Sequence, residues 1–127
     1  MTGIRFIRFR NKRIQDKGEV SAVPFLTGAD DTVHLSGGIT AFAPGSTVRA
    51  HSHNTEEMLT ILRGSALIEA GGQRFEAEQF DVCYLPAGEF HRVTNVGDSG
   101  LLVLWIYGST TPVRFLGDEG VWKPGGP

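Results

Sequence analysis

The feature that most constrains the fold is a succession of short apolar runs separated by turn residues. Each run is four to eight residues long and rich in Val, Ile, Leu, Phe and Thr, as β-strands are. Turn signals such as Pro44-Gly45 and Gly71-Gly72 lie between them. The predicted strands are Ile4–Phe9, Val20–Phe25, Thr32–Leu35, Gly38–Phe42, Thr47–His51, Met58–Leu62, Ala66–Glu69, Gln73–Glu78, Val82–Leu85, His91–Thr94 and Leu101–Tyr107.

No stretch has the apolar period of a helix, and many short strands at this spacing indicate an all-β sandwich or barrel. The clearest hairpin joins Ala66–Ala70 to Gln73–Glu78 through two glycines that tolerate positive φ. The 127 residues can bury one core without disulfides, and the chain has one cysteine. We therefore expect a single domain over residues 1–127, with a basic strand or arm at 1–17 and a disordered tail at 123–127.

Several classes of protein are disfavoured by the distribution of apolar residues. The longest apolar run, Leu101–Tyr107, is seven residues long and is too short to cross a membrane. Arginines interrupt the apolar residues near the N-terminus, so no signal-peptide core is recognisable. A lone cysteine fits a reducing compartment. We expect a cytoplasmic protein that has no membrane partner.

Charge is unevenly distributed along the chain. The net charge is −2, but the first 17 residues hold six basic side chains and one acidic one, which leaves −7 for the rest. A basic arm could bind nucleic acid, but the acidic remainder would repel phosphate, so we expect no nucleic-acid partner. We favour an edge or exchanged strand at Ile4–Phe9, because arginine also protects strand edges.

Three of the four histidines lie close together in the sequence and indicate a metal site. His51 and His53 are separated by one residue, so both point to the same face of a strand. Glu57 follows a short polar turn, and His91 opens another strand. Three imidazoles and a carboxylate suit Fe, Mn, Co, Ni, Cu or Zn, whereas Ca and Mg favour oxygen ligands. These four residues are the candidate ligands of one divalent transition metal ion.

Two spaced motifs surround these residues. The first reads G-x5-H-x-H-x3-E-x6-G and the second reads P-x-G-x2-H-x3-N. With these motifs the sequence resembles the cupin superfamily, in its small single-domain form, whose second motif begins with a further glycine where this chain has Phe80. The motif positions are Gly45, His51, His53, Glu57, Gly64, Pro86, Gly88, His91 and Asn95.

The resemblance implies a fold, a site and an assembly. The fold would be the cupin double-stranded β-helix, a jelly-roll barrel. The metal ion would lie in the barrel, held by His51, His53, Glu57 and His91, and the protein would form a homodimer. Phe80 puts in doubt only the conformation of one turn, because it replaces none of the ligands.

Four protein ligands on an octahedral ion leave two positions open, which is typical of catalytic sites. The leading hypothesis is a dioxygenase-like metalloenzyme that acts on a small organic acid, carbonyl or phenolic substrate. The alternatives are a non-redox isomerase, cyclase or lyase, and a module that binds a small ligand without catalysis. A purely structural zinc site is the simplest alternative to all three.

Four further residues complete the predictions. Arg49 has the strand parity of the first two histidines and is a candidate for binding a substrate carboxylate, unless strand twist turns it outward. Tyr84 is a second candidate for substrate contact, because small pockets need aromatic walls. Asn95 is expected to hydrogen-bond a neighbouring loop. His34 lies outside both motifs and is expected on the surface or at the pocket rim.

Overall fold

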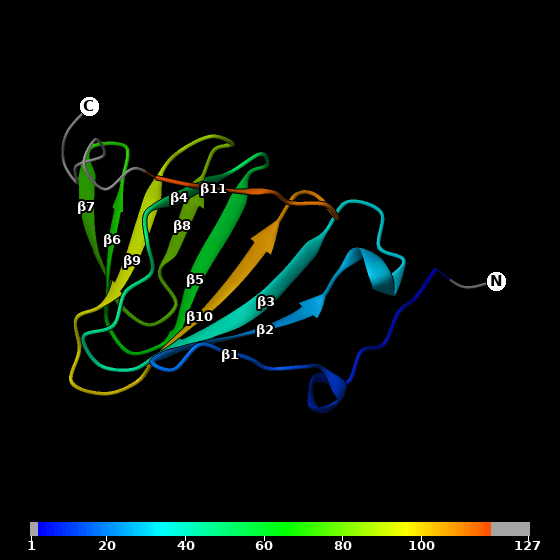
Figure 1. Ribbon diagram of the computed structural model, residues 1–127, viewed down its shortest axis with the longest axis horizontal. Coiled ribbons are helices and arrows are strands. Elements are labelled where there is room, and N and C mark those ends of the chain that lie inside the picture. Colours follow the sequence, from blue (N-terminus) through cyan, green and yellow to red (C-terminus); the bar gives the residue numbers. More distant parts are fainter. Residues whose placement is uncertain (1–2, 118–127) are drawn as a thin grey trace.

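The computed structural model describes residues 3–117, which form two antiparallel β-sheets (Figure 1). Only two short 3-10 helices, η1 (Phe9–Asn11) and η2 (Gly28–Asp30), accompany the sheets in this part of the chain. In spatial order the larger sheet contains β1 (Gln15–Asp16), β2 (Val20–Leu26), β3 (Ser36–Phe42), β10 (Leu101–Tyr107), β5 (Glu57–Arg63) and β8 (Val82–Leu85). The smaller sheet contains β11 (Arg114–Leu116), β4 (His51–His53), β9 (His91–Asn95), β6 (Ala66–Ala70) and β7 (Gln73–Ala77).

The core lies between the two sheets, where alternate residues of each strand point inward. Leu59, Ile61 and Val103 from the larger sheet pack in one cluster with Ile68 and Val93 from the smaller one. Each such side chain contributes about 1.5–3 kcal/mol when it is fully buried. The two-residue period of the strands therefore fixes which side chains face the interior, and the predicted all-β architecture is confirmed.

The predicted glycine hairpin is confirmed. Strands β6 and β7 pair in register from Ala66 opposite Ala77 to Ala70 opposite Gln73. Gly71 and Gly72 have φ values of 59° and 74°, the left-handed conformation that a two-residue hairpin turn requires.

Two predicted strands are wrong for the single chain. Ile4–Phe9 pairs with no strand, because β1 already occupies the edge beside β2, and η1 begins at Phe9. Thr32–Leu35 belongs to a turn that follows η2, where Asp31 takes a φ of 58° and redirects the chain. In both cases short apolar runs lack a neighbouring strand edge that is free to pair.

Other boundaries moved by a few residues. The predicted strand Thr47–His51 is reduced to one bridge between Thr47 and Thr94, and β4 begins at His51. Strands β1 and β11 were not predicted, because runs of two or three residues are too short to show a strand pattern. The tail predicted at 123–127 lies outside the described residues. Within residues 3–117, no helix is long and apolar enough to span a membrane.

Candidate metal site

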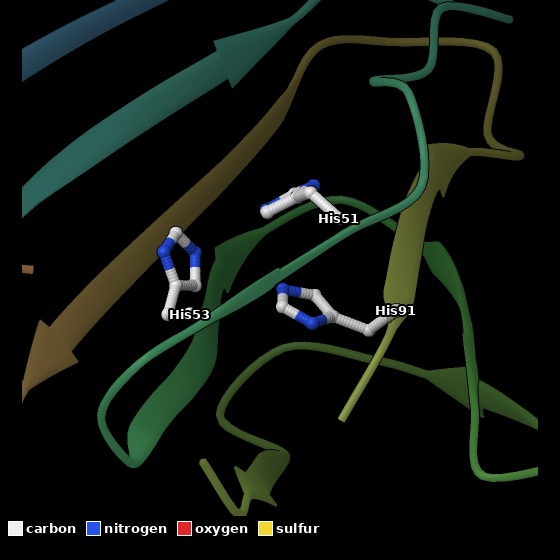
Figure 2. A group of neighbouring side chains, drawn as sticks. All are labelled: His51, His53 and His91. Atoms are coloured by element: carbon white, nitrogen blue, oxygen red, sulfur yellow. The ribbon is translucent and has the colours of Figure 1, made fainter. Parts of the chain in front are cut away.

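The three histidines of the two motifs meet between the sheets. His51 and His53 lie on β4 and His91 on β9, directly opposite His51 in the strand register. Figure 2 shows the three rings pointing toward one another. One ring nitrogen from each lies within 4.8 Å of the others, and all three side chains are buried. The histidines predicted to share one site therefore come together, and they could hold a metal ion.

Backbone carbonyl groups fix the orientation of two of these rings. The Nδ1 atom of His51 donates to the carbonyl oxygen of Arg49 at 2.8 Å, and that of His91 donates to the carbonyl oxygen of Glu89 at 3.1 Å. A carbonyl oxygen only accepts, so the proton resides on Nδ1 and the lone pair of Nε2 is free. This is the arrangement in which outer hydrogen bonds orient imidazole ligands toward a metal.

Glu57 approaches the same point from the larger sheet. Its Oε1 atom lies 3.2 Å from Nε2 of His91 and 3.6 Å from Nε2 of His53. This oxygen is buried and receives no hydrogen bond from any described residue. Leaving a buried acceptor unpaired costs about 1–3 kcal/mol, and a bound cation would remove that penalty. The donor set and the unpaired oxygen both fit a divalent transition metal ion.

The electrostatic environment keeps the imidazoles of His51 and His53 neutral. Burial, the nearby ring of His91 and the charge of Arg114 lower the pKa of His51 to about 3. Burial also lowers the pKa of His53, against the opposing effect of Glu57. Only neutral histidine binds a metal, so both rings are ready for coordination at neutral pH.

Tyr107 is a site residue that neither sequence motif includes. It lies on β10 directly opposite Glu57, and its hydroxyl oxygen is 3.1 Å from Nε2 of His53. Burial, and then the Glu57 carboxylate, raise the pKa of Tyr107 far above the usual range, so it stays a neutral phenol. Its strand parity with Val103, which points into the core, was a signal that could have identified it.

The histidines open into a cavity of about 750 Å³ between the sheets, here called the histidine cavity. Its walls are largely apolar and include Trp105, whose Nε1 donates to Thr40 at 2.8 Å. Apart from the histidines, its charged lining residues are Lys17, Arg49, Glu57 and Arg114. The cavity therefore combines a cluster that could hold a metal ion with three basic side chains.

The two predicted substrate contacts lie in different places. Arg49 lines the histidine cavity, and its Nε donates to the carbonyl oxygen of Gly117 at 3.1 Å. Tyr84 lines a separate hollow between β7 and β8 and is mostly exposed. Arg114, which the sequence did not single out, is close to the histidines, with Nη2 3.3 Å from Nδ1 of His51. The short strand that carries it left no recognisable pattern.

Two further residues singled out from the sequence, Asn95 and His34, lie away from the histidine cavity. Asn95 is buried, and its amide donates to the carbonyl oxygens of Phe42 and Ser99 and accepts from the backbone of Gly97. The loop-bonding role predicted for Asn95 is therefore confirmed. His34 is exposed, as expected, and does not line the histidine cavity.

Comparison with known proteins decides the family. The model of the cupin domain matches residues 38–107, which is more than half of the chain. The protein belongs to the cupin family. This cupin is 32% identical to the oxalate-binding protein of Thermotoga maritima over 89 aligned residues. The alignment covers 67% of this chain and 72% of the relative. The recognition made from the two motifs is confirmed.

Two other relatives are longer than this cupin. The 5-nitrosalicylic acid 1,2-dioxygenase of Bradyrhizobium sp is 30% identical over 64 residues, which are 50% of this chain and 31% of that enzyme. A solved structure of oxalate decarboxylase from Bacillus subtilis superposes with a TM-score of 0.78 at 20% identity, over 86% of this chain and 31% of that one. At that identity the likeness concerns the fold, and it confirms the jelly-roll barrel.

Phe80 shows how this cupin departs from the family pattern. It occupies the position of the signature glycine and has a φ of 72°, the left-handed conformation that favours glycine. The turn is kept although the residue is not, and Phe80 Nα still donates to the carbonyl oxygen of Ile61 at 2.7 Å.

Proposed function

We propose that this cupin is a metal-dependent protein that acts on a small organic acid, with dioxygenase-like chemistry. The observation that carries the proposal is the histidine cavity itself, where a metal-ligating cluster shares one space with Lys17, Arg49 and Arg114. Basic side chains beside a divalent ion favour a substrate that carries negative charge.

In this proposal His51, His53, Glu57 and His91 are the protein ligands. Fe(II) or Mn(II) at this position would supply a Lewis acid and an electron source for reaction with dioxygen. Manganese is a reasonable candidate, because the oxalate decarboxylase of Bacillus subtilis has Mn(II) centres. The other ions that suit this donor set are Co, Ni, Cu and Zn.

The remaining cavity residues would bind and orient the substrate. The guanidinium groups of Arg49 and Arg114 can each bind a carboxylate through two parallel hydrogen bonds. The neutral hydroxyl of Tyr107 can donate a hydrogen bond to a substrate oxygen beside His53. Apolar walls such as Trp105 would exclude water and so strengthen both contacts.

Oxygen chemistry is favoured over other metal reactions by one relative. The Bradyrhizobium dioxygenase is named for an acid substrate, which agrees with the charge of the histidine cavity. A second candidate function, binding of an organic acid without turnover, is favoured by the Thermotoga maritima relative, which is named as an oxalate-binding protein.

Oxygen uptake by the reloaded protein tests the proposal. Metal-free protein is loaded anaerobically with Fe(II), Mn(II) or Zn(II) and mixed with oxalate, salicylate, catechol or a 2-oxo acid. We expect oxygen uptake with at least one acid and Fe(II) or Mn(II), but none with Zn(II) or after His91→Ala. Turnover that persists with Zn(II) and consumes no oxygen would favour an isomerase, cyclase or lyase. Acid binding in calorimetry without turnover would favour the binding protein, and neither binding nor turnover would overturn both functions.

We also propose that the protein works as a homodimer in the cytoplasm. Strand β10 is apolar on both faces, and Leu102, Leu104 and Ile106 alternate with the residues that face the interior. These three side chains are only half-buried in the single chain, so a second copy could cover them. The free thiol of Cys83 suits a reducing compartment.

A further inference from the structure

A second hollow opens at the edge of the barrel farthest from β1. It has a volume of about 490 Å³ and lies between β7 and β8, the last strands of the two sheets. Every charged residue that lines it is acidic, namely Glu76, Asp81 and Glu89. We call it the acidic hollow. Its apolar lining includes large exposed side chains, which are Phe75, Val82 and Tyr84.

The three carboxylates of the acidic hollow are not neutralised within the described chain. Among residues 3–117, no basic side chain forms a salt bridge with Glu76, Asp81 or Glu89. Strands β7 and β8 each pair on one side only, which leaves backbone groups on their outer edges. A surface that combines acidic groups, exposed apolar side chains and free strand edges fits an extended segment that is both basic and apolar.

The N-terminal arm, residues 3–14, has that composition. It contains five basic residues and no acidic one. Four of its large apolar side chains are exposed, including Ile4 at 79% and Phe6 at 77%. Residues 3–8 form no regular structure and pair with no strand. Exposed apolar residues on an unpaired basic segment indicate a partner surface of opposite charge.

The arm does not reach the acidic hollow of its own chain. Figure 1 shows the arm and β7 at opposite ends of the molecule. The Nζ atom of Lys12 is 2.8 Å from the carboxylate of Asp30, and Nε of Arg5 donates to the carbonyl oxygen of the same residue. These contacts place the arm beside η2 of its own chain, with Lys12 near the base of the arm and Arg5 near its tip. The arm could therefore fill the acidic hollow only of another copy.

We propose that the N-terminal arm of one copy binds in the acidic hollow of a second copy. Arginine side chains of the arm face the three carboxylates, and Ile4 and Phe6 cover the exposed side chains Phe75 and Tyr84. The backbone of the arm runs along the free edges of β7 and β8, as in other cases where an extended segment joins a sheet edge. The predicted exchanged strand at Ile4–Phe9 would thus form only between copies.

Disulfide trapping tests this arrangement, because Cys83 is the only cysteine and lines the acidic hollow. The variant Phe6→Cys is oxidised with diamide at about pH 9, since burial raises the pKa of the Cys83 thiol. We expect most of the protein to form a covalent dimer, with the disulfide between the introduced cysteine and Cys83 of the other copy in peptide mapping. A disulfide forms only when the two Cα atoms approach to about 4.4–6.8 Å.

Matched variants make the trapping specific. Val33 is 77% exposed, as Phe6 is, but lies outside the arm. The variant Val33→Cys should therefore give less than a tenth of the covalent dimer that Phe6→Cys gives. The double variant with Phe6→Cys and Cys83→Ser should form no disulfide in the acidic hollow, because the cysteine of the hollow is removed. A disulfide within one chain, or equal trapping by Val33→Cys, would overturn the proposal. Trapping that appears only after residues 118–127 are removed would also overturn it, because these residues would then occupy the hollow.

Charge exchange provides a second test that needs no cysteine. Arg8→Glu and Glu76→Arg should each raise the dimer dissociation constant several-fold in sedimentation experiments, and the double variant should restore it. A protein that remains monomeric at all concentrations contradicts the proposal. So does a dimer that neither variant weakens, because the outer face of β10 would then hold the two copies together without the arm.

Discussion

The histidine cavity and the acidic hollow lie between the same two sheets, yet their charges are opposite. The first is lined by Lys17, Arg49 and Arg114 around one carboxylate, whereas the second has only acidic charged residues. The jelly-roll barrel provides both openings, and the side chains on the walls decide what each can bind. The comparison teaches that one β-barrel can carry a basic cavity and an acidic hollow between the same two sheets.

The two openings also differ in how deeply their side chains are buried. The histidines of the cavity come from paired strands and are buried, with two of the rings held by backbone carbonyl groups. The acidic hollow is formed by edge strands, and its largest apolar side chains are exposed. Preorganised buried ligands suit a metal ion, whereas an exposed edge suits a segment that becomes ordered on binding.

The largest expected effect is the loss of bound metal when the histidine cavity is changed and the acidic hollow is left intact. His53→Ala removes one of three convergent imidazoles, so we expect metal retained after purification to fall at least about 100-fold. Circular dichroism should still show a folded β-protein. His34→Ala, which changes the exposed histidine outside the cavity, is the control and should keep the metal. Unchanged metal content in His53→Ala would refute the site.

The basic wall of the cavity is tested by Arg114→Gln. A charge-assisted hydrogen bond contributes about 1.5–3 kcal/mol, so removing it should weaken binding of oxalate or salicylate to the metal-loaded protein by about tenfold or more. Metal content should not change. Arg63→Gln removes an exposed arginine that lines neither opening and serves as the control in calorimetry. Equal affinities for the two variants would contradict anion recognition by this wall.

A smaller effect is expected where the arm is anchored. The hydrogen bond from Lys12, and then that from the backbone of Thr27, lower the pKa of Asp30 below its ordinary value of 3.8. A lowered pKa in the folded state stabilises the protein above about pH 4, and this contribution disappears as the pH falls through the folded-state pKa.

Asp30→Asn should therefore reduce the free energy of unfolding by about 1 kcal/mol at neutral pH. The difference from the unchanged protein should vanish near pH 2 in urea titrations. Asp31→Asn, at the next position, is the control, because Asp31 forms no salt bridge among residues 3–117, and it should change the free energy of unfolding little. A constant deficit at every pH would show that the anchor does not depend on charge.

The smallest effect concerns the turn beside the acidic hollow. Phe80→Gly relieves a left-handed conformation, and the side chain is 70% exposed, so little packing is lost. The strain that is relieved in the folded state is slightly larger than the free-energy cost of the extra conformational entropy that glycine gives the unfolded chain. We therefore expect the free energy of unfolding to rise by about 0.5 kcal/mol. Gln79 does not have a positive φ, so the control variant Gln79→Gly should lower the free energy of unfolding. Metal binding in the cavity should be the same in both variants.

Much of the fold could be predicted from the sequence, because two-residue periodicity and glycine turns are local signals. The hairpin at Gly71-Gly72 is an example, since its turn needs positive φ whatever surrounds it. Ile4–Phe9 was predicted as an edge or exchanged strand, and the edge alternative is wrong, because its pattern shows no sign that β1 occupies the edge. Strand pairing over long distances decides such cases, and a single sequence does not reveal it.

The cluster of histidines was predictable for the same local reason, because spacing placed two of them on one strand face. Arg114 was not, since it reaches the cavity from a three-residue strand that pairs with β4 far away in the sequence. Tyr84 was predicted as a substrate contact from composition alone, and it lines the acidic hollow. Composition gives the aromatic residues, but strand order decides which opening each one lines.

The central claim is that one metal ion is bound by His51, His53, Glu57 and His91. A crystal structure of the metal-loaded protein, with anomalous data at the metal absorption edge, tests it most directly. The account predicts a single anomalous peak about 2.0–2.2 Å from the three Nε2 atoms and from a Glu57 carboxylate oxygen. A peak bound through Nδ1, a peak elsewhere, or none in protein soaked with excess Mn(II), Fe(II) and Zn(II) would contradict it.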